Sequence, residues 1–332
     1  MSNKPLISII IPVYNKARYI KKCLNSLLNQ SFTNFEIVIV NDGSTDNSGM
    51  LLEMYAAEDN RIVYIATENG GVSSARNVAL EKAYGEYVTF VDADDYVEFG
   101  YLQDIVKHIG EERADLYMWG IMKETAEGIC TPFNPTMRGE YDRMQFLKLS
   151  VKNQYIECPG ICGFVSNKLL KREVITKYKL KFDPQVPLSE DLDFFLSFYN
   201  VMHKVVVFEN TGYHYIQDAE NSSATRNNVD YLQLIDIQFK YQKIVSDNAA
   251  LTSESKYVFR NYINGLALAS LLEMHTVSYQ KVKELMKELA KRGIMYHDIA
   301  VLRPSLKAFL GKNRLLTIYL KMWQKYLQLR RQ

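Results

Sequence analysis

Four apolar segments near the start of the chain alternate with three segments of helical spacing, and this alternation limits the possible folds most strongly. The apolar segments are nearly continuous and rich in β-branched residues, as expected for strands covered on both faces of a parallel sheet. Joined by right-handed crossovers, these elements predict an α/β fold in which helices cover both faces of an open, mostly parallel sheet. Strands are expected at residues 6–13, 35–40, 61–66 and 86–91, with helices at 17–29, 47–57 and 73–84 between them.

The later part of the chain is less regular. Pro132 and Pro135 indicate a loop that continues to Arg138. The pattern predicts an α/β domain at 1–228, with halves at about 1–119 and 120–228, and a helical C-terminal region at 229–332. Within the second half we expect a strand at 115–119, helices at 142–151, 168–178 and 189–202, a strand pair at 204–208 and 212–216, and a polar loop at 217–228.

Composition indicates a globular chain with a substantial core, since 47% of its 332 residues are hydrophobic. No apolar run reaches the length of a bilayer span, and the segment after Met1 lacks the apolar core and cleavage site of a signal peptide. Four scattered cysteines are too few for a disulfide framework and show no paired zinc spacing. We therefore expect a cytoplasmic protein.

The positive charge is concentrated at the C-terminal end. Residues 303–332 carry eight Lys or Arg and no Asp or Glu, and subtracting these eight charges from the net +2 leaves −6 for residues 1–302. Together with Trp323 and Tyr326, the segment is typical of basic amphipathic helices that lie on the anionic inner face of a plasma membrane. Its apolar face is equally compatible with packing on residues 229–292 or on a second subunit. A nucleic-acid partner is disfavoured because the basic stretch is short.

Polar residues follow each of the first four predicted strands. Because the carboxyl ends of parallel strands meet at one edge of a sheet, these segments should form one ligand site. Asp92, Asp94 and Asp95 directly follow a buried strand, where so much charge is unfavourable unless a cation is bound. Oxygen-rich ligand sets suit Mg²⁺ or Mn²⁺, which keep open positions for substrate phosphates. An isolated Asp-x-Asp motif is, however, also common in ordinary turns.

Four motifs in this order closely resemble those of the family-2 inverting glycosyltransferases of GT-A fold, and the resemblance covers about residues 5–225. They are Ile10-Ile11-Pro12-Val13-Tyr14-Asn15, Val40-Asn41-Asp42-Gly43-Ser44-Thr45-Asp46, Gly71-Val72-Ser73-Ser74-Ala75-Arg76-Asn77 and Val91-Asp92-Ala93-Asp94-Asp95. The resemblance implies that 1–228 is a GT-A catalytic domain with a nucleotide-sugar half before an acceptor half. Residues 229–332 would be a helical attachment to it.

The resemblance also implies a role for individual residues. Asp42 would accept a hydrogen bond from uracil, Asp94 would bind a Mn²⁺ or Mg²⁺ ion that bridges two phosphates, and Asp95 is a weaker candidate for a second metal contact. An ordinary turn with a helix cap at Ser44 or Asp46, and a solvated Arg76, are the structural alternatives. The expected nucleotide-sugar site comprises Pro12, Tyr14, Asn15, Asp42, Gly71, Arg76, Asp92 and Ala93.

Further along the chain, Ser189-Glu190-Asp191 is similar to the Glu-Asp motif of the same family. By this resemblance Asp191 is the general base, and Glu190 supports the acceptor or orients Asp191. Alternatively, Ser189 only caps a helix whose acidic first turn is favourable. His214 and residues 221–223 lie where the family often has a loop that closes over the diphosphate, although a strand histidine and a surface loop explain them equally well. Departures from the family pattern at Val165 and Leu170 leave the acceptor open.

The resemblance thus implies an inverting hexosyltransferase that moves one sugar from a UDP-sugar to an acceptor hydroxyl. The acceptor would be a growing surface polysaccharide or a glycoprotein glycan, lipid-linked or protein-linked, and the sugar stays open. A dehydrogenase is disfavoured because Pro12–Asn15 replaces the glycine-rich turn that follows the first strand. Two alternatives remain, a nucleotidyltransferase and a catalytically silent partner subunit that uses the fold to bind another transferase.

Overall fold

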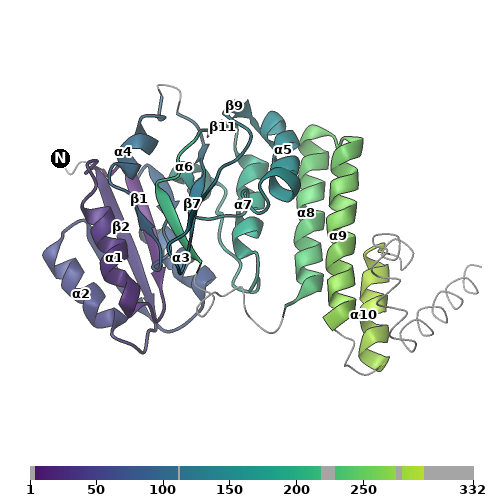
Figure 1. Cartoon of the computed structure of the whole chain (residues 1–332), viewed down its shortest axis with the longest axis horizontal. Helices are drawn as coiled ribbons and strands as arrows, with labels where there is room; N and C mark the ends of the chain where they lie inside the picture. Colours follow the sequence, from purple (N-terminus) through teal and green to yellow (C-terminus); the bar gives the residue numbers. More distant parts are fainter. Residues whose placement is uncertain (1–3, 111–112, 218–228, 274–278, 295–332) are drawn as a thin grey trace, which may run out of the picture. The chain divides into compact units, whose positions relative to one another are not determined.

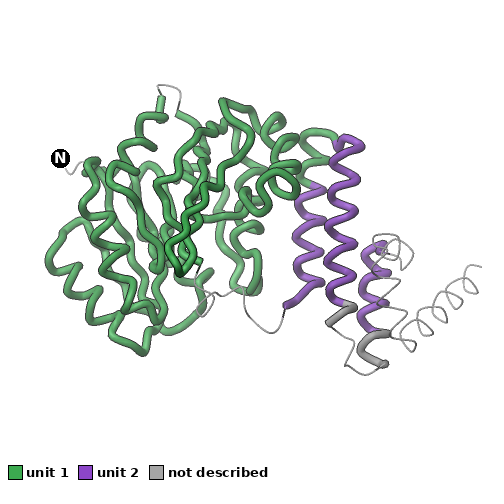
Figure 2. Tube along the Cα trace, in the orientation of Figure 1, with its two compact units in different colours: residues 1–227, 244–250 green, residues 228–243, 251–332 purple. Residues whose placement is uncertain are grey.

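The computed structural model describes residues 4–110, 113–217, 229–273 and 279–294. The chain divides into two compact units, shown in different colours in Figure 2. Unit 1 contains residues 1–227 and 244–250, and unit 2 contains residues 228–243 and 251–332. The predicted polar loop beyond residue 217 and the basic segment 303–332 lie outside the described residues.

Unit 1 is built on an eight-stranded sheet with strand order β3-β2-β1-β4-β10-β6-β11-β9 (Figure 1). The first four strands are parallel, and β10 runs antiparallel between β4 and β6. Strand β11 is parallel to β6, and β9 closes the edge antiparallel to β11. The expected mostly parallel α/β sheet is therefore confirmed. Its strands are β1 (Ile7–Val13), β2 (Phe35–Asp42), β3 (Ile62–Thr67), β4 (Tyr87–Phe90), β6 (Leu116–Met118), β9 (Gly139–Asp142), β10 (Lys168–Lys171) and β11 (Lys204–Val207).

The crossover helices form where the apolar spacing predicts them. They are α1 (Ala17–Leu28), α2 (Ser48–Glu58) and α3 (Val72–Lys82). Helix α1 buries four residues at the three- and four-residue spacing of an amphipathic helix, against the alternate β1 residues Ile7, Ile9 and Ile11. Helix α3 packs on β1 and β2 through Ala75 and Ala79, which are not part of the apolar cluster that contains these residues of α1 and β1. Each fully buried Leu or Ile contributes roughly 1.5–3 kcal/mol.

A second sheet of four strands, in the order β5-β12-β7-β8, occupies part of the region predicted as a loop. That prediction was wrong because Pro132 lies in β8, an edge strand, where a residue without an N–H is tolerated. The predicted strand pair at 204–208 and 212–216 was also wrong. Both strands exist, but β11 belongs to the large sheet, whereas β12 pairs with β5 and β7. The four strands are β5 (Tyr96–Val97), β7 (Ile121–Thr125), β8 (Cys130–Phe133) and β12 (Tyr213–Gln217).

The helix predicted at 168–178 begins as a strand. Residues Lys168–Lys171 form β10, because Leu169 and Leu170 are both buried between β4 and β6, and only Arg172–Lys177 is helical. The helix expected at 142–151 is confirmed, with a capping box between Asp142 and Gln145. The remaining helices of unit 1 are α4 (Tyr101–Val106), α5 (Arg143–Lys152), a π-helical turn (Asn153–Glu157), α6 (Arg172–Lys177) and α7 (Glu190–Val201).

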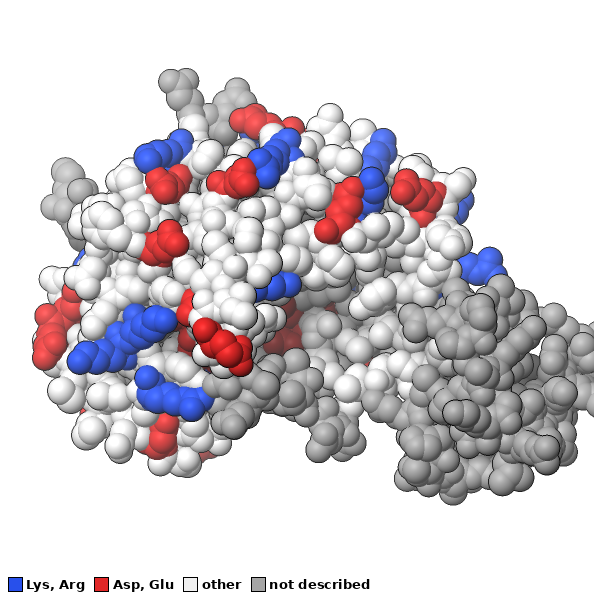
Figure 3. Space-filling view, viewed as in Figure 1, with Lys and Arg blue, Asp and Glu red and all other residues white. Residues whose placement is uncertain are grey.

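The rest of the described chain is helical, as predicted. It contains α8 (Tyr231–Ala249), α9 (Ser253–Glu273) and α10 (Tyr279–Lys291). An apolar cluster that includes Ile235, Ile263 and Leu289 forms the core of unit 2. Among the described helices, none combines the length and the apolar character needed to cross a bilayer. On the face shown in Figure 3, the described Lys and Arg side chains are interspersed with Asp and Glu, unlike the basic stripe of a nucleic-acid-binding surface.

Replacing Gly85 with Ala should destabilise unit 1, because an added Cβ would lie 2.5 Å from the Ser8 backbone nitrogen and 2.8 Å from the Tyr87 carbonyl oxygen. We expect a loss of roughly 1–3 kcal/mol, as for other overpacked sites. The matched control is Gly110→Ala, since no described atom lies within 4 Å of a Cβ added there. Urea denaturation of the full chain should show a lower midpoint for the first variant and an unchanged one for the second. Equal midpoints would contradict the close approach.

Candidate active site

The loops after β1 and β2 are tied together by side-chain hydrogen bonds. Asn15 has a φ of 50°, a left-handed conformation that asparagine tolerates better than most residues. Its Oδ1 accepts hydrogen bonds from the backbone nitrogens of Thr45 (2.8 Å) and Asp46 (3.2 Å), and its own N–H donates to Ser44 Oγ (3.0 Å). The Asp46 carboxylate accepts the first N–H groups of both α1 and α2, at Ala17 and Ser48. Asn15 therefore shapes the edge of the predicted nucleotide pocket.

Asp42 joins the end of β2 to the start of α3. Its Oδ1 accepts the Gly70 N–H at 2.8 Å, and its Oδ2 accepts the Gly71 N–H at 2.9 Å. Gly71 has a φ of 84°, a left-handed conformation that favours glycine, and a Cβ at Gly70 would lie 2.8 Å from Ser74 Oγ, which would have to rotate away. Each carboxylate oxygen keeps a further lone pair, so Asp42 retains the capacity to accept a hydrogen bond from a base.

Arg76 connects three acidic residues from two segments that are far apart in the sequence. Its Nη1 lies 2.5 Å from Asp191 Oδ1 and 3.4 Å from Glu190 Oε1, and its Nη2 lies 3.2 Å from Asp92 Oδ1. Burial disfavours the guanidinium charge, but the carboxylates of Asp191, Asp92 and Glu190 outweigh it and raise the Arg76 pKa. Arg76 is 3% exposed, which excludes the solvated alternative. Helix α3, the loop after β4 and the start of α7 therefore meet at this side chain.

Asp191 lies in the first turn of α7, where its surroundings favour the protonated form of the carboxyl group. Burial raises its pKa to about 7, with further increases from Glu190 and Asp92 that the charge of Arg76 opposes. A carboxylate that titrates near neutral pH is suited to proton transfer. The structural alternative for this motif holds in part: the first turn of α7 is acidic, but Ser189 has a left-handed φ of 60° and its side chain caps none of the described backbone N–H groups.

The three carboxylates that follow β4 differ in burial and in their hydrogen-bond partners. Asp95 is 2% exposed and accepts hydrogen bonds from Tyr213 Oη (2.5 Å) and the Ile216 N–H (2.8 Å), so it anchors this loop to β12. Burial together with Asp92 and Asp94 raises the Asp95 pKa well above its usual range. Ala93 packs in the core of unit 1, so it can offer a ligand only its backbone. Asp92 and Asp94 remain partly exposed.

Asp94 already pairs with a cation, the ammonium group of Lys16. This pair shows that the carboxylate is placed to hold positive charge, and a carboxylate donor suits Mn²⁺ or Mg²⁺. The residues present therefore fit the divalent ion that the resemblance implies. Lys16 was missed by the sequence reasoning, and its position directly after Asn15 is the only signal that could have found it.

Four other residues complete the description. Pro12 is buried in β1, and the ring of Tyr14 is 47% exposed beyond it. Lys168, also missed from the sequence, is fully buried and donates to the Asn167 Oδ1 atom (2.6 Å) and the Ile161 carbonyl oxygen (3.1 Å). Burial lowers the Lys168 pKa to about 7. His214 lies in the second sheet, and residues 221–223 lie outside the described residues.

This sheet, with acidic and basic groups gathered beyond the ends of its first strands, defines the GT-A class of glycosyltransferases. The sequence profile described as "Glycosyl transferase family 2" matches residues 8–178. The chain belongs to this family and is a glycosyltransferase, as the motifs predicted.

Two relatives in sequence support the assignment. The "Uncharacterized glycosyltransferase EpsJ" of Bacillus subtilis is 30% identical over 304 residues, which are 89% of this chain and 85% of EpsJ. The poly(ribitol-phosphate) beta-N-acetylglucosaminyltransferase TarS of Staphylococcus aureus is 29% identical over 234 residues, 69% of this chain but 39% of TarS.

The structural comparisons concern the fold. The structure of TarS residues 1–349 with UDP-GlcNAc has a TM-score of 0.67 at 21% identity and covers 97% of this chain and 91% of its own. The mannosyltransferase PcManGT of Pyrobaculum calidifontis, solved with GDP-Man and Mn²⁺, has a TM-score of 0.51 at 14% identity, with coverages of 97% and 87%. Both share the fold of this chain over nearly its whole length.

The Arg76→Gln substitution should destabilise unit 1 strongly, because it leaves three partly buried carboxylates without their common cation. Breaking such a network costs roughly 3 kcal/mol or more. Arg138→Gln is the matched control, since Arg138 pairs with Glu209 on the surface with both side chains about half exposed. An exposed pair contributes under about 1 kcal/mol. Thermal unfolding should separate the two variants, and similar midpoints would refute a structural role for the Arg76 network.

Proposed function

We propose that this protein is an inverting glycosyltransferase that moves one sugar from a UDP-sugar to an acceptor hydroxyl on a growing cell-surface polymer. The observation that carries the proposal is the contact of Arg76 with Asp92, Glu190 and Asp191. This contact brings Asp92, which is expected to face the donor sugar, next to Asp191, which is expected to be the base. A transferase needs the donor sugar and the base close together, so that the base can assist attack on the anomeric carbon.

The donor would bind along the ends of β1, β2 and β4. The exposed ring of Tyr14 offers a stacking surface for a base, and Asp42, at the end of β2, offers a hydrogen-bond acceptor. Asp92 and the backbone of Ala93 would contact ribose or sugar hydroxyls. Asp94 would hold the metal once its ion pair with Lys16 is broken, and Lys16 would then contact a phosphate. When bound, Mn²⁺ or Mg²⁺ would neutralise charge on the leaving diphosphate.

Asp191 would accept the proton of the acceptor hydroxyl as that oxygen attacks the anomeric carbon. Attack from the face opposite the leaving UDP inverts an α-linked donor to a β-linked product. Arg76 would keep the Asp191 carboxylate oriented, and Glu190 would share that cation or contact the acceptor. General-base assistance of this kind accelerates a reaction by roughly 10² to 10⁴-fold.

The relatives support the substrate classes. TarS acts on poly(ribitol-phosphate) and was solved with UDP-GlcNAc, which favours a UDP-sugar donor and a surface-polymer acceptor here. The acceptor would be lipid-linked or protein-linked. PcManGT was solved with GDP-Man, so a GDP-sugar donor is the alternative within this fold. The basic segment 303–332 remains a candidate contact with an anionic membrane surface or with a second subunit.

Two other functions predict different behaviour. A nucleotidyltransferase would release pyrophosphate, and a catalytically silent partner subunit would bind nucleotide without turnover. Asp92, Asp94 and Asp191 are all present and partly exposed in the described site, which favours an active transferase.

A panel of UDP- and GDP-sugars with Mn²⁺ tests the donor assignment. We expect slow release of UDP from one UDP-sugar without acceptor, measured by coupled detection of the nucleotide. Asp94→Asn should abolish metal-dependent binding of UDP in calorimetry, whereas Asp104→Asn, on the exposed face of α4, should bind as the wild type does. Release from GDP-sugars alone would overturn the UDP assignment, and unchanged binding by Asp94→Asn would overturn the metal assignment.

Transfer should depend on the ionisation of Asp191. Because its pKa is raised to about 7 and the base must be deprotonated, the rate should fall as the pH drops through about 7. Above about pH 7, Asp191→Asn should reduce transfer by roughly 10² to 10⁴-fold while UDP binding persists, and its residual transfer should not fall as the pH drops through about 7. The matched control is Asp193→Asn, two residues further along α7. If Asp191→Asn kept near-normal transfer, the base would have to be another residue.

A further inference from the structure

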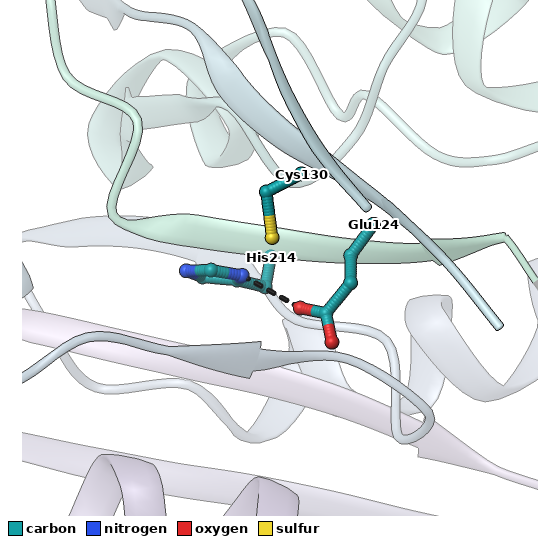
Figure 4. A group of neighbouring side chains, drawn as sticks. All are labelled: Glu124, Cys130 and His214. Carbon is teal, nitrogen blue, oxygen red and sulfur yellow. Dashed lines mark hydrogen bonds and ion pairs between the residues drawn. The ribbon is translucent and has the colours of Figure 1, made fainter. Parts of the chain in front are cut away.

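The second sheet carries a cluster of three potential metal ligands outside the proposed active site. Glu124 lies in β7, Cys130 in β8 and His214 in β12, and their side chains point toward one another (Figure 4). One carboxylate oxygen, the Sγ atom and one imidazole nitrogen all lie within 4.8 Å of one another. The strand register brings these three side chains together. Glu124 pairs directly with Cys130 of β8 and with Ile216 of β12, and Ile216 lies two residues from His214 on the same strand.

We propose that Glu124, Cys130 and His214 bind a Zn²⁺ ion. A thiolate, an imidazole and a carboxylate form a mixed sulfur, nitrogen and oxygen set that suits zinc and does not suit Mg²⁺. Glu124 and His214 have side chains only 17% and 10% exposed, whereas Cys130 is exposed. The ion would therefore enter from the solvent side at Cys130 and keep its fourth position for a water molecule.

The surroundings of His214 match those of a metal-binding histidine. Its Nδ1 faces Glu124 Oε2 at 2.8 Å, and its Nε2 lies 3.1 Å from Glu98 Oε1. Ligating histidines commonly donate their other N–H to a carboxylate, which orients the ring and sets its tautomer. The ring of Tyr96 stacks on the imidazole with centroids 4.3 Å apart, and its hydroxyl donates to Glu124 Oε2 at 2.6 Å. Both buried ligands are thus held in place before any ion binds.

Charge balance favours a divalent cation. With Cys130 as a thiolate, the cluster and Glu98 carry three negative charges, and Lys22, whose Nζ lies 3.4 Å from the Tyr96 ring centroid, adds one positive charge. Two negative charges remain to be neutralised. Metal binding would release the Cys130 thiol proton and any proton held between His214 and Glu124.

The position of the cluster gives the ion a structural role. Its ligands come from three neighbouring strands, so the metal would fasten the β7–β8 hairpin to β12. Strand β12 in turn holds Asp95 through Tyr213 and Ile216. A zinc ion here would therefore stabilise the support of the loop that carries Asp92 and Asp94, without contacting the donor.

Metal binding to the full-length protein, freed of metal by chelation, tests this inference without any transfer assay. We expect Co²⁺, as a spectroscopic substitute for Zn²⁺, to produce a thiolate-to-cobalt charge-transfer band, and Zn²⁺ to abolish that band by displacement. Cys130→Ser should lose the band, while the matched control Cys158→Ser, at a buried cysteine, should keep it. Asp94→Asn should also keep it, which separates this site from the proposed catalytic metal.

Two further measurements make the test independent of misfolding. Zn²⁺ should raise the unfolding temperature of the wild type and leave that of Cys130→Ser unchanged. Glu98→Gln, at a side chain 59% exposed, should weaken cobalt affinity by roughly 10- to 100-fold, as expected for a residue that orients a ligand. A band that persists in Cys130→Ser would show that another cysteine binds the cobalt, and no cobalt band in the wild type would show that the cluster binds no such ion; either result would overturn the proposal.

Discussion

The guanidinium group of Arg76 is the point on which the arrangement of the site depends. It is almost fully buried, and it lies between carboxylates from the loop after β4 and from the first turn of α7. Without this cation, Asp92 and Asp191 would repel each other in a poorly solvated region, and the N-terminus of α7 would not stay at the sheet edge. Because the same group opposes the raised pKa of Asp191, it links the stability of unit 1 to the ionisation of the proposed base.

The acidic residues of the site differ in what binds their oxygens. Asp42 and Asp95 accept backbone N–H groups and a tyrosine hydroxyl, so they hold the loops that form the rim. Asp92, Asp94 and Asp191 are paired with the cations Arg76 and Lys16 and are partly exposed. Ion pairs with partly exposed side chains can exchange one cation for another more readily than buried backbone contacts can break. The second group is therefore the one suited to substrate and metal.

The second sheet links this rim to a region with no expected part in catalysis. Strand β12 supports Asp95 on one side and presents His214 to the β7–β8 hairpin on the other. A change that loosens the hairpin would consequently reach the loop that carries Asp92 and Asp94 through β12. The β5 strand, which begins directly after Asp95, provides a shorter path for the same coupling.

The first half of the fold follows from the sequence because its signals are local. Apolar runs with β-branched residues predicted β1 to β4, amphipathic spacing predicted α1 to α3, and the order of motifs predicted the family. The sequence misassigned residues 168–171 and 120–138, because β10 and the β7–β8 hairpin form only when partner strands supply their hydrogen bonds and bury Leu169 and Leu170. Which carboxylate pairs with Arg76 or Lys16 was decided by the tertiary structure alone. Those partners lie up to 115 residues apart, and short-range periodicity carries no information about contacts made at that separation.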